Sequence, residues 1–395
     1  MNRPIPLPSH ILALMARMES AGEEVYLVGG SLRDALLGIP PHDFDLAVSS
    51  PPERTMEILS DYRVIATGIA HGTVTVIAAG EPVEITTFRV DGDYTDARHP
   101  DRVSFTRRIE EDLSRRDFTV NAMAYHPRKG LCDSFGGRED LERGILRAVR
   151  EPSLRFSEDA LRIMRAFRFS AQLGFEIEAR TLAGISETRA GLSRIASERI
   201  ASEFLRLLCS PRAREALGGM IEREVLPYVT GDYRPSERIL SAISASRPVE
   251  EERLGLFFAE ATSEEAVRIA KGLRLSNKQI TAIGAVGRAA GRRIATPSDA
   301  RRLIADCGVY APFGIRASVL LGNSPEEAIG WIEDNQSPCT ISELAVGGRD
   351  LIAAGIEPRR VGKTLEHLLS LVLERPEANE RDALLSMALA YNDRK

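Results

Sequence analysis

Two aspartates at alternate positions are the residues whose types and spacing best suit chemistry. Residues 43–48 read Asp-Phe-Asp-Leu-Ala-Val, an alternation typical of a half-buried strand. Such a strand places Asp43 and Asp45 on one face, where they repel each other unless a cation neutralises them. Mg²⁺ commonly binds one or two carboxylates together with substrate phosphates. The pair therefore predicts a magnesium site for a phosphate-bearing substrate, with a solvated turn as the alternative.

A glycine pair precedes these aspartates. Residues 25–28, Val-Tyr-Leu-Val, predict a buried strand that ends at Gly29 and Gly30, where the backbone can approach another group closely. A short helix should follow, with Ser31 as its N-cap and Arg33 one turn inside. Because helix N-termini bind phosphate, this segment strengthens the prediction of a phosphate site.

The next segments supply the rest of a sheet. The β-branched, alternating segments 72–78 and 82–89 predict neighbouring strands. Glu84, on the second, can add a third carboxylate, although we favour an ordinary exposed strand position for it. Residues 90–101 have no hydrophobic period and are rich in Gly, Asp and Pro, which predicts a loop.

A basic segment follows, with Arg-Arg-Asp-Phe-Thr-Val-Asn-Ala at 115–122. Arg116 can bind a phosphate through two donors, while Asp117 and Asn121 can brace the turn from which it projects. An amphipathic helix would explain the apolar residues of this segment equally well. We expect a turn-rich hairpin over 133–144 and a helical pattern from about residue 152 onwards.

The first informative helix beyond that point is expected over 158–169. Asp159, Arg162 and Arg165 would share one broad face of it, with Phe169 among the apolar residues opposite. The alternative is a surface helix whose ion pairs contribute only about 0.3–0.5 kcal/mol each. Further amphipathic helices are expected at 9–21, 197–208, 212–226, 235–246, 249–260, 264–274, 276–290 and 297–306.

Composition bounds the class of protein. The chain has 395 residues and a formal net charge of −5, which argues against a protein that coats nucleic acid indiscriminately. No apolar run approaches about 18 residues, so we expect a cytoplasmic protein without a membrane span. The four cysteines are far apart in the sequence and predict neither a zinc site nor a disulfide framework.

Together these motifs resemble the bacterial, class II tRNA nucleotidyltransferases, the family of CCA-adding enzymes and their poly(A) polymerase relatives. The resemblance runs collinearly through the Gly-Gly and Asp-x-Asp segments, residues 115–122 and Glu-Asp-x-x-Arg at 158–162. It implies an α+β fold: a small mixed nucleotidyltransferase head, like that of polymerase β, followed by an elongated all-α neck, body and tail. The expected boundaries are 1–150 for the head, 151–212 for the neck, 213–335 for the body and 336–395 for the tail.

The resemblance also implies a function. The chain would add and repair the 3′-terminal CCA of tRNA from CTP and ATP, without a template, and with Mg²⁺ held by the catalytic residues Asp43 and Asp45. An Asp accepts from the exocyclic amino group of cytosine or adenine and an Arg donates to a ring acceptor, so a side-chain pair can select these bases. The implied nucleotide-binding residues are Gly29, Gly30, Arg33, Arg116, Asp159, Arg162, Arg165 and Arg168.

The expected partner is tRNA, bound at its 3′ end and along its acceptor and T arms. The sequence leaves open whether the protein forms a homodimer. Residues 341–365 resemble the family's tRNA-binding tail, except that Arg359 and Arg360 replace an expected Gly-Pro. The 90–101 loop has the length expected for terminal A addition. We therefore expect that removing Asp93 to Arg98 would block addition of A and spare addition of C.

Other functions remain. A relative that adds only A, only CC or a poly(A) tail fits the sequence nearly as well. A small-molecule nucleotidyltransferase has no need of so long a helical remainder, which counts against that class. The intact pair of Asp43 and Asp45 counts against a catalytically dead RNA-binding module.

Overall fold

The computed structural model describes residues 5–41, 43–69, 72–91 and 103–393. They form two compact units, one of Met1–Leu207 with Glu215–Val229 and one of Leu208–Arg214 with Thr230–Lys395. The loop predicted at 90–101, with its segment Asp93 to Arg98, lies almost wholly outside the described residues.

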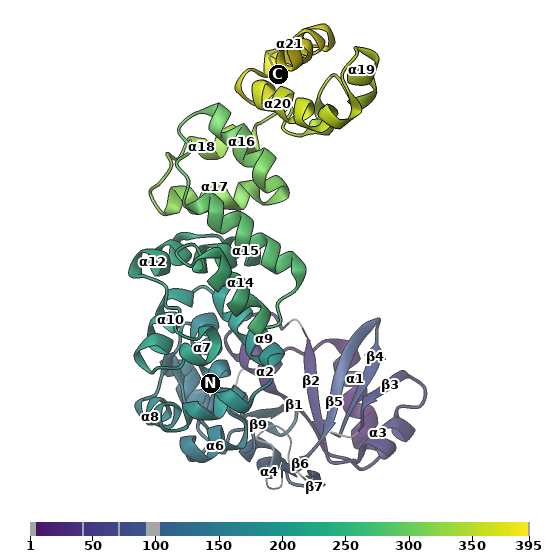
Figure 1. Cartoon of the computed structure of the whole chain (residues 1–395). Coiled ribbons are helices and arrows are strands. Elements are labelled where there is room, and N and C mark those ends of the chain that lie inside the picture. The colour runs from purple at the N-terminus through teal and green to yellow at the C-terminus, as the bar shows by residue number, and fades with distance from the viewer. Residues whose placement is uncertain (1–4, 42, 70–71, 92–102, 394–395) are drawn as a thin grey trace. The chain divides into compact units, whose positions relative to one another are not determined.

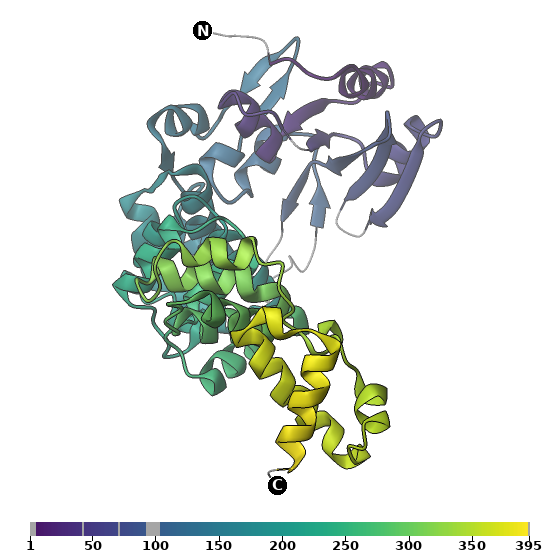
Figure 2. The same ribbon diagram turned by 90° about the horizontal axis from the view of Figure 1, so that it is seen from above.

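The first unit is built on a mixed sheet, in which the described residues form seven strands in the order β3-β4-β5-β2-β1-β8-β9 (Figure 1). Central β1 pairs antiparallel with both β2 and β8, whereas β2 pairs parallel with β5. Figure 2 shows these strands side by side in purple to blue. The strands are β1 (Val25–Val28), β2 (Phe44–Val48), β3 (Arg63–Gly68), β4 (Thr73–Ala78), β5 (Glu81–Thr87), β8 (Ala124–His126) and β9 (Gly130–Cys132).

The predicted sheet is confirmed in its centre and incomplete at its edges. The segments expected at 72–78 and 82–89 are β4 and β5, which pair antiparallel. Strand β3 at one edge and strands β8 and β9 at the other were not predicted. Two short strands, β6 (Arg89–Asp91) and β7 (Val103–Phe105), pair with each other at the two ends of the predicted loop.

Helices cover the sheet. They are α1 (Ser9–Ser20), α2 (Gly29–Leu36), α3 (Pro52–Ile58), α4 (Ile109–Ser114), the 3₁₀ turn η2 (Thr119–Asn121) and α5 (Gly137–Arg143). Helix α1 contacts β1 and α3 and buries Ile11, Leu14, Met15 and Met18. Leu12 of the same helix is 42% exposed.

The turn-rich hairpin expected over 133–144 is wrong, because most of this segment is helix α5. Gly136 and Gly144 adopt left-handed conformations, with φ of 73° and 66°, and so bound the helix at its two ends. The carboxylate of Asp133 accepts hydrogen bonds from two backbone N–H groups of the first turn. The glycines that suggested a hairpin are therefore the boundaries of a helix.

The single helix expected over 158–169 is also wrong, because it breaks at Asp159 into α6 (Pro152–Glu158) and α7 (Leu161–Leu173). Asp159 has extended backbone angles, and its Oδ1 accepts the N–H of Leu161 at 3.0 Å. This local side-chain bond competes with the helical one, as aspartates commonly do. The remaining elements of this region are α8 (Ala179–Thr188), η3 (Arg189–Arg194), α9 (Ser197–Leu208) and the parallel pair β10 (Ile145–Leu146) and β11 (Glu176–Ile177).

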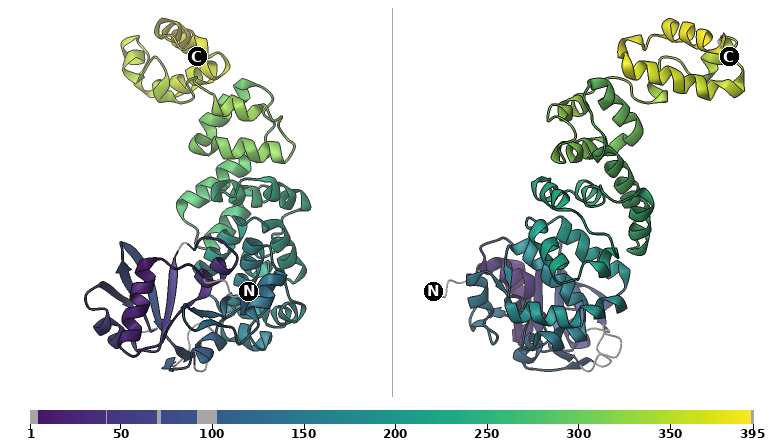
Figure 3. Two further views of the ribbon diagram at one scale, coloured as in Figure 1. Left: turned by 180° about the vertical axis from the view of Figure 1, so that it is seen from behind. Right: turned by 60° about the vertical axis from the view of Figure 1, so that its left-hand side comes forward.

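The rest of the chain is helical, as predicted, with helix ends that differ from expectation by a few residues. Helices α10 (Ala213–Glu222) and α11 (Pro227–Thr230) belong partly to each unit. The helices of the second unit, green to yellow in Figure 3, are α12 (Glu237–Ala245), α13 (Glu250–Phe257), α14 (Ser263–Gly272), α15 (Asn277–Ala290), α16 (Pro297–Cys307), α17 (Ala311–Leu320), α18 (Ala328–Glu333), α19 (Gly348–Ala353), α20 (Val361–Glu374) and α21 (Arg381–Asp393).

One run in this unit, Pro297–Leu320, is long and apolar enough to be a candidate membrane span by length and composition alone. A 3₁₀ turn that begins at Gly308 divides it into α16 and α17. Leu303 and Ile315, one from each helix, are buried in a shared hydrophobic core. The run is therefore a pair of core helices of this unit.

Residues 344–388 form a further small core, to which α19, α20 and α21 contribute Leu351, Leu368 and Leu384. The unexpected Arg359-Arg360 pair lies in a 3₁₀ turn, Pro358–Arg360, directly before α20. Its first arginine donates to Glu357 at 2.8 Å. All four cysteines of the chain are free thiols.

Candidate active site

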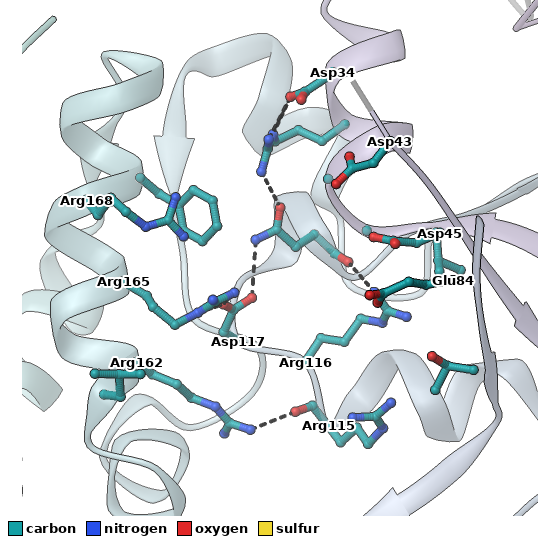
Figure 4. A pocket seen from close by; sticks show the side chains of 18 of the residues that line it. Asp34, Asp43, Asp45, Glu84, Arg115, Arg116, Asp117, Arg162, Arg165 and Arg168 are labelled. Atoms are coloured by element: carbon teal, nitrogen blue, oxygen red, sulfur yellow. Dashed lines mark hydrogen bonds and ion pairs between the residues drawn. The ribbon is translucent and has the colours of Figure 1, made fainter. Parts of the chain in front are cut away.

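A cavity of about 730 Å³ lies inside the first unit, between the sheet and helix α7. Carboxylates of the sheet line one side of it, and arginines of α7 line the other (Figure 4). It brings together every candidate site residue that the sequence predicted: Gly29, Gly30, Arg33, Asp43, Asp45, Arg116, Asp159, Arg162, Arg165 and Arg168.

The carboxylate side depends on the register of two strands. Parallel pairing places Asp45 of β2 opposite Glu84 of β5, and Asp43 directly precedes β2. The pKa of Asp45 is raised to about 6, first by burial and then by the charges of Asp43 and Glu84, which together outweigh the opposing charge of Arg116. Glu84 is exposed, as we expected, and nevertheless lines the cavity beside the aspartates. This side therefore carries an excess of negative charge.

A glycine allows the end of β1 to come close to these groups. Gly29 has a φ of +71°, and a Cβ at this position would lie 3.3 Å from Nη1 of Arg116 and 3.4 Å from Oδ2 of Asp45. The expected cap by Ser31 is wrong, because α2 begins two residues earlier. The Ser31 hydroxyl instead donates to the carbonyl of Val28 at 3.0 Å and accepts the N–H of Asp45 at 3.4 Å.

The two arginines nearest the carboxylates are held differently. Arg33 is buried, donates twice to Asp34 at 2.8 and 2.7 Å, and donates to Oδ1 of Asn121 at 2.9 Å. Arg116 donates to Asp112 at 3.1 Å and to the carbonyl of Asn121 at 3.4 Å. Within the described residues, its buried Nε has no hydrogen-bond partner. Arg116 is therefore the less completely satisfied of the two.

The predicted bracing of the 115–122 turn is confirmed, and the alternative of an amphipathic helix is wrong. Oδ1 of Asp117 accepts the N–H of Phe118 at 2.8 Å and the amide of Asn121 at 3.2 Å. Residues 119–121 form a 3₁₀ turn rather than an α-helix. This turn fixes the backbone from which Arg116 projects.

On the arginine side, each guanidinium of α7 has a carboxylate partner. Nε of Arg165 donates to Oδ2 of Asp117 at 2.8 Å, and Nη2 of Arg165 forms an ion pair with the same oxygen at 2.7 Å. Burial alone would raise the pKa of Asp117, but the charge and hydrogen bonds of Arg165 outweigh it and lower the pKa to about 2. Arg168 pairs with Glu203 of α9 and donates to Gln172 at 2.9 Å.

An aromatic ring lies beneath these cations. The guanidinium carbon of Arg168 is 3.9 Å from the ring centroid of Phe169, and those of Arg165 and Arg33 are 5.2 and 5.3 Å from it. Cations are attracted to the face of an aromatic ring at such distances. The expectation that Phe169 lies on the face opposite the arginines is therefore wrong, because its ring lines the cavity.

Arg162 and Asp159 have partners that the sequence did not identify. Nη1 of Arg162 donates to the carbonyl of Arg155 at 3.0 Å and to Glu158 at 2.7 Å, and its Nη2 donates to the carbonyl of Arg115 at 3.0 Å. Oδ2 of Asp159 accepts Nη2 of Arg199, on α9, at 2.9 Å. The pair Glu158–Arg162 is thus not the surface pair of the alternative interpretation.

Several lining residues were missed from sequence, among them Arg199, Gln172 and Asp34. Arg199 and Glu203 are four residues apart and so share one face of α9. That spacing alone gives no sign of the cavity, because it is equally typical of a solvated helix face.

The arrangement suits a divalent cation bound together with phosphates. Within the described chain, no group of three His, Cys, Asp or Glu residues forms a ready metal cage. Mg²⁺ does not require one, since it commonly binds one or two carboxylates and completes its shell with water and substrate phosphates. Asp43 and Asp45 fit this role, because they lie together with Glu84 on one side of the cavity, where burial and then these neighbouring charges raise the pKa of Asp45.

A mixed sheet that carries paired carboxylates at a strand end, beside a glycine-bounded helix and a set of arginines, defines a nucleotidyltransferase head. Residues 25–147 match the model of the poly A polymerase head domain. Residues 174–231 match the family described as the probable RNA and SrmB-binding site of polymerase A.

Full-length relatives narrow this class. The chain is 37% identical to a CCA-adding enzyme of Limosilactobacillus fermentum and 35% identical to one of Pediococcus pentosaceus; the first comparison covers 95% of both chains, and the second covers 95% of this chain and 96% of the relative. The crystal structure of the CCA-adding enzyme of Bacillus stearothermophilus in complex with CTP matches with a TM-score of 0.82 and 32% identity, over 97% of each chain. The chain belongs to the CCA-adding enzymes, a family of tRNA nucleotidyltransferases.

Proposed function

We propose that this protein adds and repairs the 3′-terminal CCA of tRNA from CTP and ATP, without a template and with release of pyrophosphate. The observation that carries the proposal is a single cavity in which uncompensated carboxylates face arginines, on a chain related over 95% of its length to CCA-adding enzymes. The solved complex of the Bacillus stearothermophilus relative with CTP supports the choice of nucleotide.

In the proposed reaction the 3′-hydroxyl oxygen of tRNA bonds to the α-phosphorus of the nucleotide, and the bond to pyrophosphate breaks. Asp43 and Asp45 would hold Mg²⁺, with Glu84 near enough to share in its binding. Mg²⁺, when bound, lowers the pKa of the attacking hydroxyl and offsets the charge of the departing pyrophosphate. The positions of Asp43 and Asp45 thereby determine where in the cavity the charge of the departing pyrophosphate is neutralised.

The triphosphate would be bound on the same side. Gly29 and Gly30 open α2, so backbone N–H groups are available to phosphate oxygens. Arg116 is the best placed side chain, since its Nε has no partner among the described residues. Arg33 contributes charge, although its donors already bind Asp34 and Asn121.

Base selection is assigned to the arginine side, by Asp159, Arg162, Arg165 and Arg168. Asp159 would accept from the exocyclic amino group that cytosine and adenine share, whereas uracil and guanine place a carbonyl there. A wrong base would leave the carboxylate facing another acceptor, and such a mismatch discriminates strongly. Arg162 would have to exchange one of its present hydrogen bonds for the base.

The proposal also assigns the helical parts. We take 1–150 as the catalytic head, 151–212 as the neck that selects the base, 213–335 as the body and 336–395 as the tail that binds the acceptor and T arms. A cytoplasmic location follows from this substrate.

The deciding experiment incubates the full chain and Mg²⁺ with radiolabelled tRNA that lacks its last three nucleotides. We expect extension by two residues with CTP alone and by three with CTP and ATP, with no extension after chelation of the metal. If only tRNA that already ends in CC is extended, and ATP is the nucleotide added, the protein is an A-adding enzyme. If extension stops after two residues even with both nucleotides, it is a CC-adding enzyme. A long tail from ATP would indicate a poly(A) polymerase.

A further inference from the structure

We propose that Arg199 of helix α9 is a positioning residue for base selection, which fixes the Asp159 carboxylate toward the cavity. The inference rests on the proposed function, because it assumes that Asp159 reads the base. It adds a residue from a second helix to the selection machinery of α7.

The contacts of Asp159 carry the first step. The residue lies in the break between α6 and α7 rather than on a helix, with extended backbone angles. Its Oδ1 accepts the N–H of Leu161 at 3.0 Å, and its Oδ2 accepts Nη2 of Arg199 at 2.9 Å. An ionised carboxylate accepts about four hydrogen bonds in total. Each oxygen therefore keeps capacity for a ligand, while both are held in place.

The second step is that Arg199 is held less firmly than the arginines of α7. Arg162 donates to three acceptors, and Arg165 contacts Asp117 through both Nε and Nη2. The Nη2 of Arg199 donates to Asp159, whereas its Nη1 is buried without a hydrogen-bond partner among the described residues. Both side chains line the cavity and remain partly accessible, at 27% for Arg199 and 16% for Asp159. The pair thus faces the ligand.

The third step is that α9 does not depend on this pair for its place. Glu203, one turn further on, pairs with Arg168 of α7. Ile200, Phe204 and Leu207 of α9 are buried. Removing the Arg199 side chain should therefore leave the helix packed while releasing one oxygen of Asp159.

A released carboxylate can rotate, so its acceptor direction no longer matches only the amino group of cytosine or adenine. It can also turn away from a carbonyl of the wrong base, which removes the penalty on which selection depends. The expected defect is a loss of discrimination rather than a general loss of rate.

The test compares Arg199→Met, Arg199→Lys and the matched control Arg206→Met in the full chain. Arg206 is an exposed residue of the same helix, two turns away, and is not among the described residues that line the cavity. The measurements are kcat/KM for CTP, UTP, ATP and GTP on tRNA acceptors of matched length, together with the thermal unfolding midpoint of each variant.

We expect Arg199→Met to reduce the CTP/UTP and ATP/GTP preferences at least tenfold, at an unfolding midpoint close to that of the control. Arg199→Lys keeps a cation and one donor, and should stay within about threefold of wild-type preference. An Arg199→Met variant that is slower with all four nucleotides in equal proportion would overturn the inference. So would a lysine variant as permissive as the methionine variant.

A double variant gives an independent readout. If Arg199 acts through Asp159, then Asp159→Ala with Arg199→Met should have no weaker preference than Asp159→Ala alone, because coupled residues are not additive. Multiplicative losses of preference would contradict the positioning role. If the wild-type protein fails to extend tRNA with CTP and ATP, the proposed function itself is refuted. If the wild type is active and the Arg199 variants keep the wild-type nucleotide preference, only the inference is refuted.

Discussion

The two sides of the cavity treat charge in opposite ways. On the sheet side, Asp43, Asp45 and Glu84 lie together, and the pKa of Asp45 is raised to about 6 by burial and by its two like-charged neighbours. On the side of α7, Arg165 binds Asp117 so tightly that the pKa of this buried carboxyl falls to about 2. In the folded protein, the carboxylate on the side of α7 therefore has a cationic partner. The carboxylates on the sheet side have too little positive charge nearby to balance them.

This difference tells which side is prepared for a ligand. Strained or uncompensated groups in a folded protein mark places where function overrides local stability. The sheet side has this character, and beside it the Nε of Arg116 has no partner among the described residues. The side of α7 does not have it, apart from Arg199 of α9. The comparison therefore assigns charge neutralisation to the sheet and geometric discrimination to the helices.

The strongest test of the comparison removes the carboxylates one at a time. Asp43→Asn and Asp45→Asn should each lower the transfer rate at least about a thousandfold, or ~4 kcal/mol in the barrier. Nucleotide binding should stay measurable, because Arg116 and the backbone of α2 are unchanged. The measurement is single-turnover transfer with nucleotide binding in parallel, and Asp61→Asn, an exposed carboxylate, is the control. A rate within about tenfold of wild type would mean that the metal assignment is wrong.

The next test breaks the completed side. Asp117→Asn keeps the shape of the side chain but leaves the charge of Arg165 without its closest partner, so the free energy of unfolding should fall by about 3–5 kcal/mol. The contribution of Asp117 is present above its unfolded pKa of about 4 and is lost as the pH falls towards 2. The destabilisation, measured by urea denaturation, should therefore shrink at acid pH. An equal effect at pH 7 and pH 3 would argue against a charge-based role.

A smaller effect is expected from substituting Asp159, the residue assigned to base selection. Asp159→Ala should reduce discrimination against UTP and GTP by about thirtyfold, or ~2 kcal/mol, and reduce turnover with CTP less. The measurement is the ratio of kcat/KM values in competition. A variant that is merely slower, with unchanged preference, would return Asp159 to the role of an ordinary ion-pair partner of Arg199.

Local patterns in the sequence predicted much of this. The alternation at 43–48 predicted both β2 and a shared face for its aspartates, and the helical period predicted α9 with its observed bounds. The Arg-Arg-Asp segment was predicted to form a braced turn, since Asp and Asn bond to nearby backbone and side-chain groups regardless of the wider fold. Such features depend on residues only a few positions apart.

The failures have a common cause in contacts between distant residues. Glycines such as Gly136 and Gly144 are equally typical of a hairpin turn and of the two ends of a helix. Packing against distant residues decides which of the two structures forms. Helix α7 was expected to begin too early, because the pattern of Asp and Arg does not show that Asp159 bonds to Leu161 and to α9. Arg199 was missed for the same reason.

The smallest expected effect concerns the incomplete side in the absence of metal. Because the pKa of Asp45 in the folded protein, about 6, exceeds its unfolded value near 3.8, the folded state holds a proton between these pH values that the unfolded chain has lost. Asp45 therefore contributes less to the free energy of unfolding as the pH rises through this range. Asparagine does not titrate, so it escapes this loss.

In metal-free protein, Asp45→Asn should consequently match wild type near pH 4 and be more stable than it at pH 8 by about 1 kcal/mol. The full shift of roughly two pKa units corresponds to ~3 kcal/mol, which partial solvation of the site reduces. Urea denaturation with a chelator at both pH values measures the difference, with Asp61→Asn as a control that should show no such trend. Adding Mg²⁺ with CTP should reverse the order, because only wild type would then gain a counterion for its carboxylate. A difference in the free energy of unfolding that is constant across pH would show that the like charges of the sheet do not destabilise the folded protein. The contrast between the two sides of the cavity would then be lost.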